Sequence, residues 1–315
     1  MSDRSDIRIV FMGTPDFASV CMDSLVNNGY NVVLAVCQPD KPVGRKHILT
    51  PPPVKVLAGE MGIECYQPDT LKTEEAFGKI SSVKPDLIVT AAYGKILPQN
   101  ILDIPAYGCL NCHGSLLPAR RGSAPVQRAI LEGDTVTGVT IMKMDAGMDT
   151  GDILDRVEVP IDPDIHTDGL MAELADKGSK LLVAMLDDYL AGKITPTPQD
   201  SSKATVCPPI RPEEGHFEWT ESALSIHNRI RALSSWPGAS TISGGKKLKI
   251  YDSSVVPDEG YVEGPAGTVV AAHKSDLIVR CGEGCLKINT LQAEGGKRLN
   301  ASDCAHNYKV GQSLN

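Results

Sequence analysis

The sequence lacks long apolar runs, has few aromatic residues and shows no recognisable secretory leader. Nowhere in its 315 residues is there a stretch near the roughly 18 apolar residues that a membrane-spanning helix needs. Aromatic side chains make up only 4% of the chain, whereas 42% hydrophobic and 22% charged residues are ordinary for a soluble protein with a sizeable core. Since the charged residues 1–6 lead directly into an apolar run, we expect a cytoplasmic protein.

Glycine-rich phosphate-binding motifs are also missing. The first predicted turn, Gly13-Thr14-Pro15, lacks the G-x-G-x-x-G spacing of a dinucleotide site. No P-loop sequence is present either. NAD is therefore not an expected cofactor.

The nine cysteines are an odd number and lie mostly inside apolar stretches, which is typical of free, buried thiols in a reducing compartment. Residues 109–113 match the C-x-x-C-H pattern of covalent haem attachment. That chemistry belongs to exported proteins, and residues three apart on a strand face opposite sides. A zinc or redox site on the same motif, with Cys281 and Cys285, is a minor alternative, so no metal is expected.

Strand and helix patterns alternate through the first 190 residues. Apolar runs bounded by Gly, Pro or Asp predict buried parallel strands at 7–12, 31–37, 86–91 and 108–112. Helices are predicted at 16–28, 70–83 and 167–191, and an edge hairpin at 136–143 and 153–159. This order predicts an α/β fold with a Rossmann-like, doubly wound sheet.

Two irregular segments interrupt the pattern. Residues 38–53 contain five prolines and several basic residues, which predicts an unusually long, functional loop. Residues 195–212 are rich in Pro, Ser and Asp and predict an interdomain linker. We therefore expect a catalytic domain over 1–194, a linker over 195–212 and a C-terminal domain over 213–315.

The C-terminal part predicts one helix followed by a small β-barrel. The helix is expected at 221–233, and short strands separated by Gly-rich turns at 239–243, 247–254, 267–272, 277–281 and 286–292. The net charge of −8 argues against a nucleic-acid partner, but basic residues of this part cluster around Arg229, Lys246 and Lys297. A local basic face can bind phosphate even on an acidic protein, although ordinary solvated surface is an equal alternative.

Asn111 and His113 are the leading catalytic candidates. They lie where a short apolar strand gives way to a loop, and side chains two apart on a strand point the same way. Ligands of open α/β sheets bind at this carboxyl edge. An amide can polarise a carbonyl oxygen, and an imidazole can move a proton, which suits acyl transfer without a covalent intermediate.

A second segment, residues 141–152, reads as an apolar strand that ends in a turn carrying Asp145, Asp149 and Asp152. Aspartate in a turn usually bonds to its own backbone. An aspartate that follows a core strand could equally orient the imidazole or take a proton from a nucleophile.

Two segments of the chain resemble the formyltransferase family that uses 10-formyltetrahydrofolate. They are Asn111-x-His113 with Ser115-Leu116-Leu117-Pro118, followed by Gly147-x-Asp149-Thr150-Gly151. Three more motifs in the same order narrow the resemblance to family members that act on methionyl-tRNA. They are residues 11–18, Asp40-Lys41-Pro42-x-Gly44-Arg45 and Ser235-Trp236-Pro237-Gly238-Ala239. The resemblance runs from about residue 7 to about residue 300.

The resemblance implies transfer of a formyl group from 10-formyltetrahydrofolate to the α-amino group of methionyl initiator tRNA, with neither NAD nor a metal. Asn111 and His113 would donate to the oxyanion, and Asp149 would hold the imidazole or accept the proton, directly or through water. Implied folate contacts are Ser115, Leu116, Leu117, Pro118, Ile96, Leu97 and Asp145. Implied tRNA contacts are Lys41, Arg45, Lys46, Arg229, Lys246 and Lys247. The last three lie in the C-terminal domain, whose barrel would be OB-like.

Several alternatives remain at this point. The same donor could serve a small amine, such as a nucleotide sugar or glycinamide ribonucleotide, and water in place of the amine would make a hydrolase that releases formate. A non-catalytic RNA-binding protein is an alternative from another class, against which the complete Asn111, His113 and Asp149 set argues. We expect a monomer, since nothing indicates a large apolar interface.

Overall fold

The structure is a computed structural model that describes residues 3–44, 47–274 and 276–315. The chain divides into two compact units. Unit 1 comprises residues 1–125, 136–160 and 171–208, and unit 2 comprises residues 126–135, 161–170 and 209–315. Each unit is described by itself.

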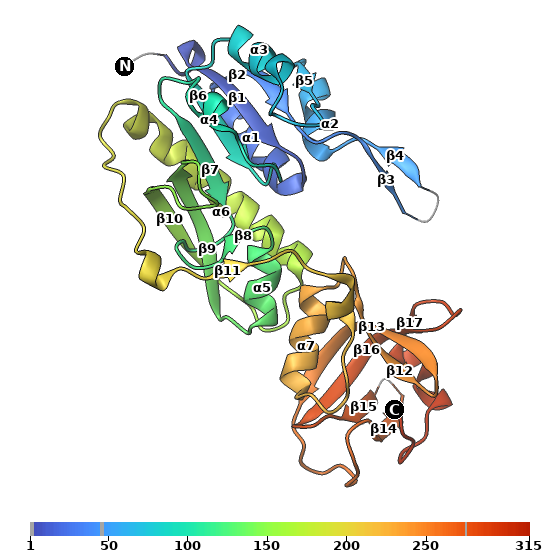
Figure 1. Cartoon of the computed structure of the whole chain (residues 1–315). Coiled ribbons are helices and arrows are strands. Elements are labelled where there is room, and N and C mark those ends of the chain that lie inside the picture. Colours follow the sequence, from blue (N-terminus) through green and yellow to red (C-terminus); the bar gives the residue numbers. More distant parts are fainter. Residues whose placement is uncertain (1–2, 45–46, 275) are drawn as a thin grey trace. The chain divides into compact units, whose positions relative to one another are not determined.

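Unit 1 is built on a seven-stranded sheet in the order β10-β9-β7-β6-β1-β2-β5 (Figure 1). The strands from β7 to β5 are parallel, whereas β9 and β10 form an antiparallel hairpin at one edge, as the sequence predicted. Their bounds are β1 Arg8–Gly13, β2 Asn31–Val36, β5 Cys65–Tyr66, β6 Leu87–Ala91, β7 Cys109–His113, β9 Val136–Lys143 and β10 Ile153–Pro160. The prediction of a Rossmann-like sheet is confirmed.

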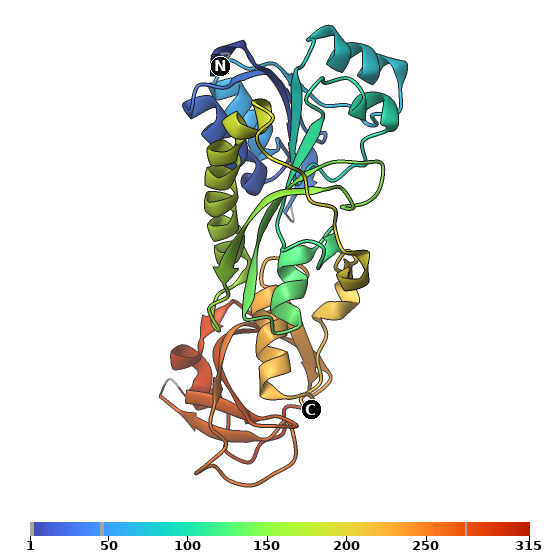
Figure 2. The same ribbon diagram turned by 90° about the vertical axis from the view of Figure 1, so that its left-hand side faces the viewer.

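Helices cover both faces of this sheet. Figure 2 shows α1 (Asp16–Asn27) and α6 (Thr167–Leu190) along one face, and α3 (Glu74–Ser82) and α4 (Gln99–Leu102) along the other. Successive side chains of a strand point to opposite faces of the sheet, so each strand contributes to the packing on both faces. On β7, Cys109 packs on the face covered by α3, whereas Cys112 contacts Cys21 of α1 on the other face. The predicted opposite facing of Cys109 and Cys112 is therefore confirmed. No helix in the described part of the chain is long and apolar enough to cross a membrane.

Two short strands lie in the segment that the sequence predicted as a long loop. Strands β3 (Lys41–Val43) and β4 (Ile48–Thr50) pair as an antiparallel hairpin that projects from the sheet of unit 1 (Figure 1). Helix α2 (Pro53–Glu60) then begins on a proline, which the first helical turn tolerates because its N–H would have no partner there. The sequence did not predict this hairpin because its two strands are only three residues long and have no buried face.

Unit 2 contains an antiparallel sheet in the order β12-β13-β16-β15-β14, with β17 added against β16. The bounds are β12 Ala239–Ser243, β13 Lys246–Val256, β14 Val269–His273, β15 Asp276–Arg280, β16 Cys285–Ala293 and β17 Leu299–Asn300. Helix α7 (Ala223–Ala232) packs against it through Ile226 and Ile230. Phe217 and Trp219 meet edge to face in the same core, with ring centroids 5.2 Å apart. The five predicted strands are all present.

Gly138 of β9 lies where the β9–β10 hairpin and the turn after β7 approach each other closely. A Cβ atom there would collide with the Val157 carbonyl oxygen and the Leu116 side chain. We expect Gly138→Ala to lower the free energy of unfolding by about 1–3 kcal/mol through overpacking. Denaturant titration of the full chain measures this change.

Gly78 provides the matched control, because it lies in α3 with nothing within 4 Å of an added Cβ. Gly78→Ala should raise the free energy of unfolding by about 0.5–1 kcal/mol, since alanine is the better helix former. Equal effects of the two substitutions would contradict the close approach at Gly138.

Candidate functional site

Asn111 occupies the middle of β7, between β6 and β9. Its register partner on β6 is Thr90, whose hydroxyl donates to Asn111 Oδ1 at 2.9 Å. This bond orients the amide, because Oδ1 accepts from Thr90 and the Nδ2 group points the other way. Nδ2 lies 3.5 Å from Asp149 Oδ1.

His113 ends β7 and is only 6% exposed. Its Nε2 lies 3.1 Å from the Arg120 carbonyl oxygen, and its Nδ1 lies 3.7 Å from Asp149 Oδ1. Since a carbonyl oxygen can only accept, Nε2 carries a proton. The free position of the neutral ring is therefore Nδ1, which faces the carboxylate.

Asp149 lies in the connection between β9 and β10 that folds back over β7. Its Oδ2 accepts from the Gly122 N–H at 2.8 Å, and its Oδ1 faces both Asn111 and His113. Its φ is 55°, in the left-handed region that aspartate tolerates better than most residues. The structure thus brings together the three residues that the sequence singled out for catalysis.

Gln199 supports this arrangement from a segment that the sequence predicted as linker. Its side-chain Nε2 donates to the carbonyl oxygens of Asp149 at 2.9 Å and Gly151 at 2.7 Å. Its Oε1 accepts from Arg121 at 3.1 and 2.8 Å. Nearby, β11 (Val206–Cys207) pairs with β8 (Arg121–Gly122). A glutamine in a proline-rich segment carries no signal of such a role in the sequence.

The predicted folate contacts differ in exposure. Ser115 and Leu117 are fully buried, and Leu97 belongs to the core of unit 1. The Thr140 hydroxyl donates to the Ser115 carbonyl oxygen at 2.7 Å and accepts from the Leu117 N–H at 3.1 Å, which fixes the turn after β7. Leu116 and Pro118 of that turn are half-buried.

Ile96 and Asp145 have different surroundings. Ile96 is 72% exposed, which is unusual for so apolar a side chain. The Asp145 carboxylate accepts from the Gly147 N–H at 3.0 Å and the Thr150 hydroxyl at 2.7 Å, so it stabilises the turn that carries Asp149. Ile96 is thus the predicted contact with the most side-chain surface open to a ligand.

The predicted tRNA contacts fall in both units. In unit 1, Lys41 is exposed and its Nζ donates to Gln38 Oε1 at 2.6 Å, while Arg45 and Lys46 lie outside the described residues. In unit 2, Lys246 and Lys247 are exposed at the start of β13. Arg229 instead pairs with Glu221 at 2.7 Å and donates to the His216 carbonyl oxygen at 2.9 Å.

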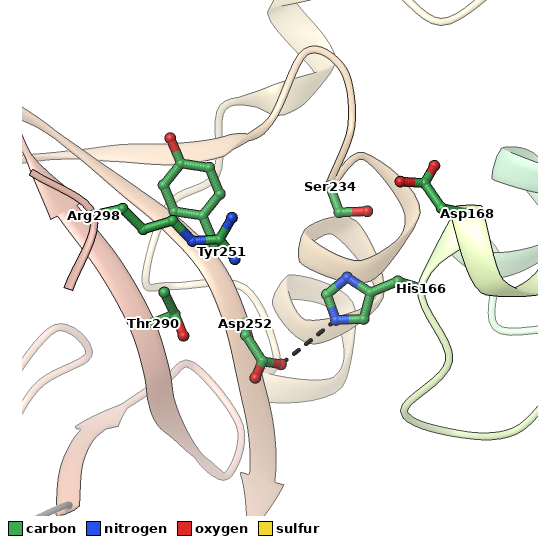
Figure 3. Close-up of a pocket in the computed structure, with 7 residues that line it drawn as sticks. All are labelled: His166, Asp168, Ser234, Tyr251, Asp252, Thr290 and Arg298. Carbon is green, nitrogen blue, oxygen red and sulfur yellow. Dashed lines mark ion pairs between the residues drawn. The ribbon is translucent and has the colours of Figure 1, made fainter. Parts of the chain in front are cut away.

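Unit 2 also holds a pocket of about 340 Å³ (Figure 3). The Arg298 guanidinium lies 4.2 Å from the ring centroid of Tyr251, and His166 Nε2 lies 3.5 Å from Asp252 Oδ1. A second cavity of about 490 Å³ lies in unit 1 between residues of α1 and α2. Neither cavity is lined by Asn111, His113 or Asp149, so cavity size does not identify the site with the acyl-transfer chemistry.

Comparison with known proteins gives matches over most of the chain. Residues 7–186 match the family described as formyl transferase, and residues 209–309 match the formyl transferase C-terminal domain. A methionyl-tRNA formyltransferase of Caldicellulosiruptor saccharolyticus is 46% identical over 306 residues, which cover 96% of this chain and 97% of that protein.

Two solved structures show the likeness of fold. Methionyl-tRNA formyltransferase from Clostridium thermocellum has a TM-score of 0.55 at 21% identity, with 79% of this chain and 94% of that chain covered. HypX from Aquifex aeolicus in complex with tetrahydrofolic acid has a TM-score of 0.66 at 16% identity, with 94% of this chain and 46% of that chain covered.

The contact between His113 Nε2 and the Arg120 carbonyl oxygen predicts the tautomer of the neutral ring. We expect the Nε2–H tautomer, which ¹⁵N chemical shifts and ring couplings of the selectively labelled protein distinguish. A neutral His113 with its proton on Nδ1 would contradict the geometry. His306, which is exposed, provides a reference in the same spectrum.

Proposed function

The chain belongs to the methionyl-tRNA formyltransferase family, and we propose that unit 1 transfers a formyl group from a folate donor to the amino group of methionyl-tRNA through Asn111, His113 and Asp149. The convergence of Asn111 Nδ2 and His113 Nδ1 on Asp149 Oδ1 carries this proposal. A hydrogen-bond donor, a proton acceptor and a fixed charge in one place are what acyl transfer to an amine needs.

The donor in this proposal is 10-formyltetrahydrofolate, a substrate that supplies a formyl group attached to nitrogen. Two observations fit a folate. The turn after β7 is held rigid by Thr140, and Ile96 presents an apolar side chain that is 72% exposed. Ligand sites combine apolar side chains with a few fixed polar groups, and here Ile96 and the backbone of this turn would supply the two kinds of contact. HypX, which shares the fold, binds tetrahydrofolic acid in its solved structure.

Asn111 is assigned to the formyl oxygen. As the amine attacks, negative charge develops on that oxygen, and a donor already aimed at it needs no reorganisation. The Thr90 hydroxyl occupies Asn111 Oδ1, so the amide presents Nδ2 rather than its oxygen. Thr90 is therefore a positioning residue that keeps Asn111 a donor.

His113 and Asp149 are assigned to the proton. The Arg120 carbonyl oxygen keeps a proton on Nε2 of His113, so in the neutral tautomer Nδ1 is an acceptor that faces Asp149 Oδ1 at 3.7 Å. The attacking amine releases a proton, directly or through a water, and this proton can lie between His113 Nδ1 and Asp149 Oδ1. His113 Nδ1 can then donate to the oxyanion or return the proton to the departing nitrogen of the folate.

The hairpin β3–β4 is assigned to the tRNA. It carries Lys41 and, in sequence, Arg45 and Lys46 between its strands, together with the exposed apolar residues Val43, Ile48 and Leu49. Basic side chains match phosphates, and exposed apolar side chains can contact unpaired bases at the acceptor end. In unit 2, the exposed Lys246 and Lys247 are assigned to the same partner, whereas Arg229 is already paired with Glu221.

The activity is tested by formyl transfer from labelled 10-formyltetrahydrofolate to methionyl initiator tRNA, methionyl elongator tRNA and free small amines in parallel. We expect label on the initiator tRNA, in a reaction that supplies cytoplasmic translation. Label on a small amine, or its release as formate, would overturn the tRNA assignment while leaving the chemistry of Asn111, His113 and Asp149 in place.

Two substitutions should separate chemistry from tRNA binding. Asn111→Ala removes the oxyanion donor, so kcat should fall about 10²–10³-fold while KM for tRNA stays near its original value. Arg45→Ala removes one basic contact, so KM for tRNA should rise about tenfold at unchanged kcat. Steady-state kinetics with varied tRNA measures both.

Asp149→Asn is the companion to Asn111→Ala, because asparagine also tolerates the left-handed backbone at this position. It should lose turnover while keeping folate affinity. Retained turnover in either catalytic variant would remove the assigned role, and an unchanged KM in Arg45→Ala would remove the assignment of the hairpin.

A further inference from the structure

Unit 1 contains a pair of thiols that the proposed reaction does not use. Cys37 directly follows β2 and Cys65 begins β5, and their Sγ atoms are 3.5 Å apart. The strands are parallel neighbours, with Ala35 paired to Cys65 and the Cys37 N–H donating to the Tyr66 carbonyl oxygen at 3.1 Å. No bond joins the two sulfurs, since both cysteines are free.

The two thiols are unequal in exposure and charge. Cys37 is fully buried and Cys65 is half-buried, so only Cys65 is open to a reagent from solvent. The hydrogen bond between the two thiols lowers the pKa of Cys65 and the Lys55 ammonium adds to this effect, whereas burial and the Asp40 carboxylate oppose it. The same bond, together with burial, raises the pKa of Cys37. One accessible thiol with a lowered pKa therefore lies beside one protected thiol.

We propose that Cys37 and Cys65 are a peroxide-reactive dithiol, in which Cys65 is oxidised first and Cys37 resolves it into an intramolecular disulfide. The combination of an accessible thiolate with a neighbouring resolving thiol is what distinguishes redox-sensitive cysteines from inert buried ones. This proposal is independent of the proposed function.

The steps balance with a hydroperoxide as the oxidant. The Cys65 thiolate attacks the peroxide, so a sulfur–oxygen bond forms, the oxygen–oxygen bond breaks and an alcohol, or water, leaves with a proton. Cys37 then attacks the Cys65 sulfur, so the disulfide forms and the sulfenic oxygen leaves as water. The two thiols lose two electrons in total, and the peroxide gains them.

The position in the fold permits the closure that a disulfide requires. A bonded pair of sulfurs is about 2.0 Å apart, so the sulfurs must approach by roughly 1.5 Å. Strand β5 is two residues long and lies at the edge of the sheet, with β2 as its neighbour on one side. Such a strand can shift more readily than one held by ladders on both sides.

Cys21 and Cys112 form a matched control within the same molecule. Their Sγ atoms are 3.9 Å apart. Cys21 lies on α1 and Cys112 on β7, and the two residues are 0% and 2% exposed. They are nearly as close together as Cys37 and Cys65, but neither of them is accessible from solvent. Proximity alone therefore predicts that both pairs oxidise, whereas our proposal predicts that one does.

The test is a non-reducing peptide map of the folded full-length chain after treatment with hydrogen peroxide and alkylation of the remaining thiols. Trypsin leaves Cys21 and Cys37 together on residues 9–45, so a second cleavage beside Asp23 separates them. We expect a cross-linked pair of peptides holding Cys37 and Cys65, lighter by two hydrogens, and at least about tenfold less of the Cys21–Cys112 product. Dithiothreitol should reverse the link.

Two variants then assign the order of events, with thermal unfolding as the check on their fold. Cys37→Ser should stop at a sulfenic acid on Cys65 that a dimedone probe traps, and Cys65→Ser should leave Cys37 unlabelled. No Cys37–Cys65 link in the wild-type chain, equal linking of both pairs, or labelling of Cys37 in Cys65→Ser would each overturn the proposal. The wild-type map decides by itself if a variant fails to fold.

Discussion

The carboxylate of Asp149 is the group on which the polar architecture of unit 1 depends. A charge that is removed from water must be matched by donors, or burial disfavours its ionised form. Gly122 supplies a backbone N–H to one oxygen and Asn111 Nδ2 faces the other. His113 Nδ1 faces that second oxygen as the position that a proton can take up. These contacts link the strand β7, the turn after it and the β9–β10 connection around one carboxylate. Catalysis would use the same fixed charge that organises the site.

The sequence predicted the parts of the structure that depend on local patterns. The parallel strands around β1 are short apolar runs, and α6 has a long amphipathic repeat, so their existence follows from periodicity. Asn111 and His113 were found because a strand followed by a loop places alternate side chains at the carboxyl edge of a sheet. The antiparallel strands of unit 2 were marked by Gly-rich turns. The two-residue strand β5 and the hairpin β3–β4 were missed, since neither is long enough to show a period.

The contacts that Gln199 makes around Asp149 could not be predicted from the sequence. Gln199 contacts the Asp149 carbonyl oxygen across 50 residues and Arg121 across 78. Such contacts follow from the tertiary path of the chain, and a proline-rich segment looks the same in sequence whether it is free or docked. Arg229 has a contact that the sequence did not indicate, and its role in binding tRNA stays a prediction. Its side chain is satisfied by Glu221, which the sequence places eight residues away on the preceding turn.

The contacts of residues 197–207 with the rest of unit 1 determine which fragment of the chain keeps the Asp149 loop in place. A fragment cut after α6, at Leu190, would contain every side chain that the sequence marks as catalytic. It would lack Gln199, the bridge from Ile153 to Thr197, and the strand β11 that pairs with β8. A fragment that keeps these contacts around the Asp149 loop extends through Cys207, the last residue of β11.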